Sequence, residues 1–177
     1  LQATQHISRI VVHPKNPDIL FVAAQGALYG PNKDRGVFKS VDGGASWSKV
    51  LYVNNLTGAA ELSMDYNNPL VLYAAMWEHQ RMPWKVISGG AGSGLYKTTD
   101  GGASWNKIHN GLPEEKGKMA IAVSRSNSDK VYTLVESDSD EELGGLFVSN
   151  NAGEKWSKVS SDHSLIQRAW YYIELFI

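Results

Sequence analysis

The chain contains one short sequence three times, at nearly regular intervals. The copies are Ser40-Val-Asp42-Gly-Gly44-Ala-Ser-Trp47, Thr98-Thr-Asp100-Gly-Gly102-Ala-Ser-Trp105 and the weaker Ser149-Asn-Asn151-Ala-Gly153-Glu-Lys-Trp156. Their third positions, 42, 100 and 151, are 58 and then 51 residues apart. That interval is too long for repeats built from helix pairs and is close to the length of one blade of a β-propeller.

Apolar runs rich in Val, Ile, Tyr and Phe surround each copy and are separated by Pro, Asn, Asp and Gly turns, so each repeat is predicted to form four short strands. The strands are expected near 8–13, 19–25, 36–41 and 46–53, near 59–65, 71–77, 94–99 and 104–109, and near 119–124, 131–136, 145–149 and 155–160. The sequence predicts an all-β fold, a partial β-propeller of four-stranded antiparallel blades over about 8–53, 59–109 and 119–160. The apolar run 170–177 is expected to be the first strand of a fourth blade, and 1–177 to be one partial propeller domain.

The repeated sequence has a sufficient structural role as a turn between the third and fourth strands. Asp and Ser/Thr side chains accept hydrogen bonds from turn amides, glycine adopts positive φ, and Trp packs between strands. Three carboxylates, one per blade, cannot converge on one substrate, and Asn151 keeps the acceptor oxygen without the charge. We therefore expect a structural role for Ser40, Asp42, Gly44, Trp47, Thr98, Asp100, Gly102, Trp105, Ser149, Asn151, Gly153 and Trp156.

Ser/Thr-X-Asp-X-Gly-X-X-Trp is typical of the Asp-box, or BNR, repeat, and the chain resembles that superfamily along essentially its whole length. The phrases Gly36-Val-Phe-Lys-Ser, Ala74-Ala-Met-Trp77-Glu and Gly94-Leu-Tyr-Lys-Thr are most similar to large bacterial secreted proteins described as glycosyl-hydrolase-like or sortilin-like. The resemblance implies an extracellular or periplasmic protein. It also implies a propeller of about six to ten blades, in a superfamily that spans sialidases, xyloglucanases, sortilin-type receptors and a photosystem II assembly factor.

Three blades do not close a ring, since propellers typically need about four to eight. We expect further blades, either from the same longer chain or from a partner chain, with a two-chain assembly of six blades as the explicit alternative. Net charge is −1, from 17 basic and 18 acidic residues, and no basic stripe is interleaved with aromatics, so neither nucleic acid nor membrane insertion is expected. The absence of cysteine excludes a disulfide scaffold.

Strand parity assigns the loops to faces. In an up-and-down meander, the repeated turns lie at the same end of the blades as the turns between the first and second strands. The loops between the second and third strands lie at the opposite end, together with the segments that connect one blade to the next. This second end, the loop face, holds the irregular sequence over 25–35, 78–93 and 136–144, and it is the expected location of a site.

The richest loop segment contains Trp77, Glu78, Arg81 and Trp84. Two indole rings with charged hydrogen-bonding groups suit a sugar-binding rim, although both rings could instead cover the ends of neighbouring blades. The glycines of 89–94 are expected to form a flexible loop, since no strand-to-helix context supports phosphate binding.

Two other loops hold weaker candidates, each with an ordinary alternative. The first loop could extend the sugar-binding rim, or its residues could simply form a turn. The residues concerned are Tyr29, Asn32, Asp34 and Arg35. The third loop could bind calcium, or it could be an acidic surface loop exposed to solvent. Its acidic residues are Glu136, Asp138, Asp140, Glu141 and Glu142.

First strands line the central channel of a propeller, and the aligned strand starts place Arg9, Glu61 and Glu174 near it. These groups either pair with one another or contribute to a central site. His6 and Arg168 precede their strands on the side of the loop face.

A glycosidase usually needs two carboxylates about 5 to 9.5 Å apart, for which Glu61 and Glu78 are the best candidates. A sialidase-like site would need several arginines, and Arg9, Arg81 and Arg168 lie on the plausible face. We expect a propeller segment of a secreted, carbohydrate-active protein, either glycan-binding or glycoside-hydrolase-like, that is not catalytically complete alone and has no cofactor and no metal. The alternative is a non-enzymatic interaction or assembly scaffold of sortilin-like type.

Overall fold

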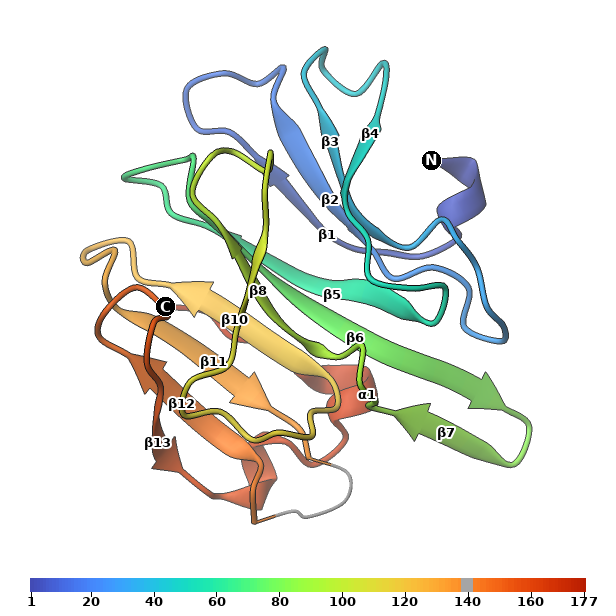
Figure 1. Cartoon of the computed structure of the whole chain (residues 1–177), viewed down its shortest axis with the longest axis vertical. Helices are drawn as coiled ribbons and strands as arrows, with labels where there is room; N and C mark the ends of the chain where they lie inside the picture. Colours follow the sequence, from blue (N-terminus) through green and yellow to red (C-terminus); the bar gives the residue numbers. More distant parts are fainter. Residues whose placement is uncertain (138–141) are drawn as a thin grey trace.

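A computed structural model gives the fold, and it describes residues 1–137 and 142–177 (Figure 1). The first sheet contains β1 (Ile7–Val12), β2 (Leu20–Ala24), β3 (Gly36–Ser40) and β4 (Ser48–Leu51). The second contains β5 (Thr57–Met64), β6 (Leu72–Met82), β8 (Gly94–Thr98) and β9 (Asn106–Ile108), and the third contains β10 (Met119–Val123), β11 (Val131–Val135), β12 (Gly145–Ser149) and β13 (Ser157–Ser160). The pairings between the described strands are antiparallel, and the four strands of each blade follow chain order, with β7 (Lys85–Ser88) added beside β6 in the second sheet. This confirms three four-stranded blades of a partial propeller.

The blades pack face to face, so the core lies between the sheets. Phe21 and Val37 of the first blade meet Leu62 and Met76 of the second, and the other face of the second blade packs against the third. The second blade is therefore covered on both faces, and β6 is buried from Leu72 to Trp77. The outermost strands β9 and β13 are mostly exposed, and the outermost strand β4 is exposed at Ser48 and Lys49.

The repeated turns form a side-chain clasp. In the first turn the Ser40 hydroxyl accepts the Gly44 amide (2.8 Å) and donates to Asp42 (2.7 Å), and Asp42 accepts the Ser46 amide (2.9 Å). The same three bonds recur in the other turns, with Asn151 in place of aspartate. The hydrogen bonds that the Asp42 carboxylate accepts from Ser46 and Ser40 lower its pKa to about 2.

Each repeated turn also bonds to the turn between the first two strands of its own blade. Gly43, Gly101 and Ala152 donate backbone hydrogen bonds to the carbonyls of Asp18 (3.0 Å), Leu70 (2.9 Å) and Asp129 (2.8 Å). The two kinds of turn therefore share one end of the sheets, as strand parity predicts. The loop face lies at the other end, where Figure 1 shows β7 and α1.

The segment 78–93 differs from the expected irregular loop. Strand β6 continues to Met82 and forms a hairpin with β7 (Lys85–Ser88), whose pairs run from His79↔Ser88 to Met82↔Lys85. The turn is Pro83-Trp84, which lacks the Asn and Gly that normally signal a two-residue hairpin. Proline fixes a negative φ at the first turn position, which excludes the turn types favoured in two-residue hairpins, so the hairpin is held by the four residue pairs of its strands rather than by its turn.

The expected fourth-blade strand over 170–177 is wrong. After β13 the chain forms η2 (His163–Leu165) and the short helix α1 (Ala169–Tyr172), and no strand is assigned from Ile173 to Ile177. Ile166, Ala169 and Ile173 are buried against Ala120 and Leu134 of the third blade. The burial of these three side chains on the third blade fixes the segment there, and this anchoring outweighs the β propensity of the aromatic run. A further short helix, η1 (Gln2–Thr4), precedes β1.

Candidate functional site

Two adjoining cavities open on the loop face, and we call them together the loop-face cleft. The helix cavity, of about 600 Å³, lies beside α1 and is lined by Glu136, Ser137, His163, Gln167, Arg168, Trp170, Tyr171 and Tyr172. The hairpin cavity, of about 270 Å³, is lined by side chains of the β6–β7 hairpin, of the first blade and of the segment before β10. Both cavities are lined by Trp170 and Tyr171, so they adjoin at α1.

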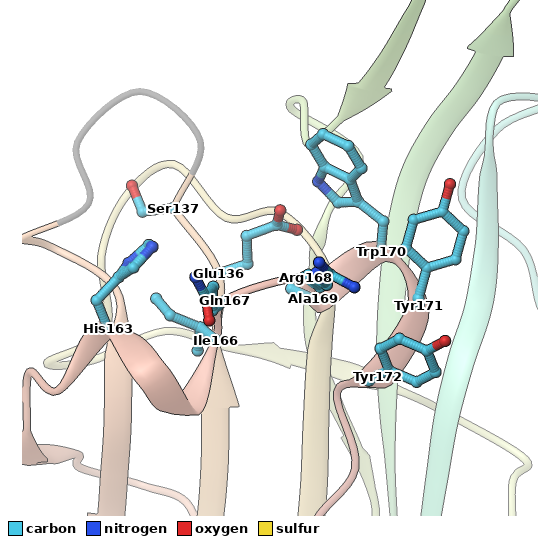
Figure 2. Close-up of a pocket in the computed structure, with 10 residues that line it drawn as sticks. All are labelled: Glu136, Ser137, His163, Ile166, Gln167, Arg168, Ala169, Trp170, Tyr171 and Tyr172. Atoms are coloured by element: carbon cyan, nitrogen blue, oxygen red, sulfur yellow. The ribbon is translucent and has the colours of Figure 1, made fainter.

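Three consecutive aromatic side chains of α1 form one wall of the helix cavity. Figure 2 shows Trp170, Tyr171 and Tyr172 on one side and His163 on the other, with Glu136 between them. The exposed fractions of the three aromatic residues are 40%, 52% and 76%. Flat rings that remain this open in a cavity wall offer stacking surfaces to a ligand.

Arg81 and Lys118 hold α1 in place over the blades. The Arg81 guanidinium donates to the Tyr171 hydroxyl (2.9 Å), and Lys118 donates to the Trp170 carbonyl (3.3 Å). Arg168 begins the helix with φ +97°, a left-handed conformation that a side chain normally avoids, and its carbonyl accepts the amides of Tyr171 and Tyr172. The aromatic wall is therefore positioned from both ends.

A buried polar chain joins the second and third blades beneath the cleft. The Trp77 indole donates to the Ser88 hydroxyl (3.0 Å), which donates to Glu136 (2.6 Å), and Glu136 also accepts the backbone amide of Lys118 (2.7 Å). The Glu136 carboxylate, one of the expected calcium ligands, is thus committed to internal hydrogen bonds. Asp138, Asp140 and Glu141 lie outside the described residues.

A second buried network ties the hairpin to the first blade. The His79 ring stacks on Trp77, with centroids 4.2 Å apart and planes 16° apart, and lies 3.2 Å from an Arg35 nitrogen. Burial, followed by the nearby charge of Arg35, lowers the pKa of His79 to about 4, so its ring is neutral at pH 7. Arg35 also donates to the carbonyls of Leu56 (2.9 Å), Ala27 (2.5 Å) and Gly30 (3.1 Å).

The structure separates the sequence candidates of the loop face. Arg81 and Arg168 line the cleft. Trp77 also borders the hairpin cavity, but it is only 3% exposed, so it serves mainly as a packing residue. Arg35, expected on the rim with Tyr29, is completely buried because its guanidinium binds backbone carbonyls. Tyr29 and Trp84 are 72% and 77% exposed, and neither lines a cavity described here.

The structure does not bring the two carboxylate candidates together. Glu61 forms an ion pair with Arg9 (Nε to Oε1, 2.5 Å), and this hydrogen bond raises the pKa of Arg9. Glu78 instead accepts the Gly92 amide (2.8 Å) in the glycine loop. On the neighbouring strand β6, Glu61 pairs with Ala75, which lies three residues before Glu78. The backbones of Glu61 and Glu78 are therefore about 10 Å apart along the strand direction.

The inner strands contain a separate cavity of about 270 Å³, to which Arg9 and Glu61 contribute together with Leu175, Phe176 and Ile177. The Arg9 guanidinium lies 5.7 Å from the centroid of the Phe176 ring. The pairing of Arg9 with Glu61 fits the structural alternative for these channel residues. Arg9 therefore does not join Arg81 and Arg168 in the lining of the loop-face cleft.

Sequence reasoning missed the residues that form most of the cleft. The sequence predicts a strand for Trp170, Tyr171 and Tyr172, and it does not indicate His163, Gln167 or Lys118 as ligand contacts, whereas the structure places all six in the lining. The sequence carries no continuous helical pattern here, because α1 has only four residues and follows the left-handed Arg168, so the position of the three aromatic residues depends on the burial of Ile166, Ala169 and Ile173 on the third blade.

Blades of four antiparallel strands, packed in chain order with a cleft at the loop end, define a segment of a β-propeller. No family model matches the chain. A xyloglucanase of Paenibacillus sp is 25% identical over 176 residues, which cover 86% of this chain and 15% of that protein. Among the described residues, no helix has the length and apolar character required to cross a bilayer.

Solved structures of GH74 enzymes share the fold. The GH74 xyloglucanase from Xanthomonas campestris superposes with a TM-score of 0.65 at 15% identity, over 92% of this chain and 24% of that one. An ancestral GH74 enzyme gives a TM-score of 0.63 at 19% identity, over 88% of this chain and 18% of that one. The chain thus spans less than a quarter of the length of each of these proteins.

Proposed function

We propose that this chain is a propeller segment of a carbohydrate-active protein and that its loop-face cleft binds glycan. The observation that carries the proposal is the aromatic wall of Trp170, Tyr171 and Tyr172 beside the hydrogen-bonding groups of Gln167 and Arg168. Pyranose rings present apolar C–H faces that stack on such rings, while their hydroxyls need directional polar partners. The similarity to a xyloglucanase supports the same class of ligand.

The segment is proposed to bind rather than to hydrolyse. Glu61 is engaged by Arg9, and Glu78 is held by Gly92 on a different part of the sheet. A hydrolase would place an acid and a second carboxylate on either side of one glycosidic bond. Hydrolysis in the complete protein would then use carboxylates contributed by other blades.

Several finer points belong to the same proposal. The three repeated turns are Asp-box motifs, the protein acts outside the cytoplasm, and further blades complete the ring. Trp84 and Tyr29, both exposed near the loop face, extend the glycan surface beyond the cleft. The sortilin-like scaffold is the alternative if no glycan binds.

The double variant Trp170→Ala with Tyr172→Ala tests the aromatic wall. It should weaken binding of neutral β-glucan oligosaccharides about tenfold or more, because each stacked ring contributes apolar contact and dispersion energy. Isothermal titration calorimetry measures the affinity. Tyr66→Ala is the matched control, since Tyr66 is 43% exposed at the end with the repeated turns. Equal affinity of the double variant and the wild type would refute the proposed site.

A further inference from the structure

The hairpin cavity has a cationic and aromatic lining. Arg81, Lys118 and His6 contribute basic groups, and Trp170 and Tyr171 contribute rings. None of the described residues that line this cavity carries a carboxylate. The helix cavity differs, because Glu136 contributes to its wall. The two halves of the cleft therefore offer different charges to a ligand.

The ammonium group of Lys118 forms no ion pair with a described residue. The ion pair found in the described part of the chain joins Arg9 and Glu61. The Lys118 Nζ donates to the Trp170 carbonyl and lies 5.4 Å from the centroid of the Trp77 ring. Burial lowers the pKa of Lys118, while the more distant Glu136, Glu61 and Glu174 act to raise it. An anion brought into the cavity would stabilise the charged form of this amine.

Arg81 has donor groups left over for a ligand. Within the described residues its side chain makes one hydrogen bond, from Nη2 to the Tyr171 hydroxyl, and its guanidinium lies 5.6 Å from the centroid of the Tyr171 ring. The other N–H groups of a guanidinium are arranged in a fixed fork that fits the two oxygens of a carboxylate. Tyr171 therefore orients Arg81 without using all of its donors.

Starting from the proposed glycan-binding function, we propose that the hairpin cavity selects an acidic sugar, a uronic acid residue of the bound glycan. Lys118 and Arg81 receive the sugar carboxylate, and the Trp170 ring supports the pyranose face. Charge-assisted hydrogen bonds are shorter and stronger than neutral ones, and a partly enclosed cavity reduces their screening by solvent. The carboxylate thus supplies the counter-charge that Lys118 does not find in contact within the described protein.

Calorimetry with tetragalacturonic acid and its fully methyl-esterified form tests the inference, because the two probes share size and linkage and differ in charge. The wild type should bind the acid at least about tenfold more tightly than the ester. Lys118→Met and Arg81→Gln should each reduce that ratio severalfold, and the ratio is the readout because loosening of α1 would lower the affinities for acid and ester together. Lys85→Met, in the exposed part of the same hairpin, is the matched control and should keep the ratio.

The outcomes separate the inference from the proposed function. Equal binding of acid and ester, or a ratio that Lys118→Met leaves unchanged, overturns the acidic-sugar inference and leaves glycan binding intact. Binding of neutral β-glucan oligosaccharides without binding of either galacturonide has the same meaning. No binding of any oligosaccharide overturns both. A substitution that only loosens α1 lowers the affinity for both galacturonides and leaves their ratio unchanged, so an unchanged ratio in both variants overturns the inference.

Discussion

At the residue scale, the third turn shows why aspartate is dispensable there. In the first two turns the second carboxylate oxygen accepts a serine hydroxyl, from Ser46 to Asp42 and from Ser104 to Asp100, both at 2.5 Å. The corresponding residue of the third turn is Lys155, which has no hydroxyl, and the single amide oxygen of Asn151 accepts the Lys155 backbone amide. The third turn therefore lacks the aspartate charge at the position where the serine hydroxyl that would bind the second carboxylate oxygen is also absent.

Ala152 is a second departure in the same turn, and it predicts a stabilising substitution. It has φ +53°, at the position where the other turns have Gly43 (+69°) and Gly101 (+68°). Ala152→Gly should raise the free energy of unfolding by about 0.5–1 kcal/mol, because glycine adopts this conformation without a Cβ clash. Urea unfolding measures the change. Gly43→Ala is the reciprocal variant and should destabilise; a loss of stability in Ala152→Gly would contradict the argument.

At the element scale, the two differences from the sequence prediction both concern segments whose structure depends on distant partners. The twelve strands of the blades follow from alternating apolar runs and turn residues, which act locally. The β6–β7 hairpin lacks a turn signal, and α1 is decided by the burial of Ile166 and Ala169 on the third blade. The cleft is built on these two elements, so its face could be predicted from strand parity while most of its residues could not.

The network that anchors the hairpin predicts an acid sensitivity. His79 has a folded pKa of about 4 against an ordinary value of 6.5, so the unfolded chain binds the extra proton between these values. The contribution of neutral His79 to the free energy of unfolding is fully present above pH 6.5. It is lost as the pH falls towards 4, which lowers the free energy of unfolding by about 2–3 kcal/mol. His79→Gln stays neutral and should show a smaller loss over this window. Urea midpoints at pH 7, 5.5 and 4.5 measure it, and parallel curves for both proteins would be the contrary result.

At the scale of the whole molecule, the two outer faces of the blade stack are unequal. The third blade is covered by Ile166, Ala169 and Ile173 of the segment that contains η2 and α1. The first blade exposes Ile7 (42%), Ile10 (60%) and Val12 (45%) on β1. Apolar side chains that are covered between blades elsewhere in the molecule thus remain open on this strand.

This asymmetry predicts that the isolated chain associates through its first blade. Burial of β1 against a second copy would remove these apolar side chains from water, in the place that a further blade takes in a closed ring. Light scattering during size-exclusion chromatography should show a mass that increases with concentration, and Ile10→Asp should shift the equilibrium to the monomer. A wild-type monomer at about 100 μM would argue against completion of the ring by association.

The bond between each repeated turn and its own blade has a consequence for how such chains change over time. Gly43, Gly101 and Ala152 reach only Asp18, Leu70 and Asp129, so the corner of a blade is complete within about 50 residues of contiguous sequence. A duplicated blade carries its corner with it, and loops at the opposite end can lengthen without disturbing that bond. Gene duplication can add scaffold while point changes and insertions at the other end alter what is bound.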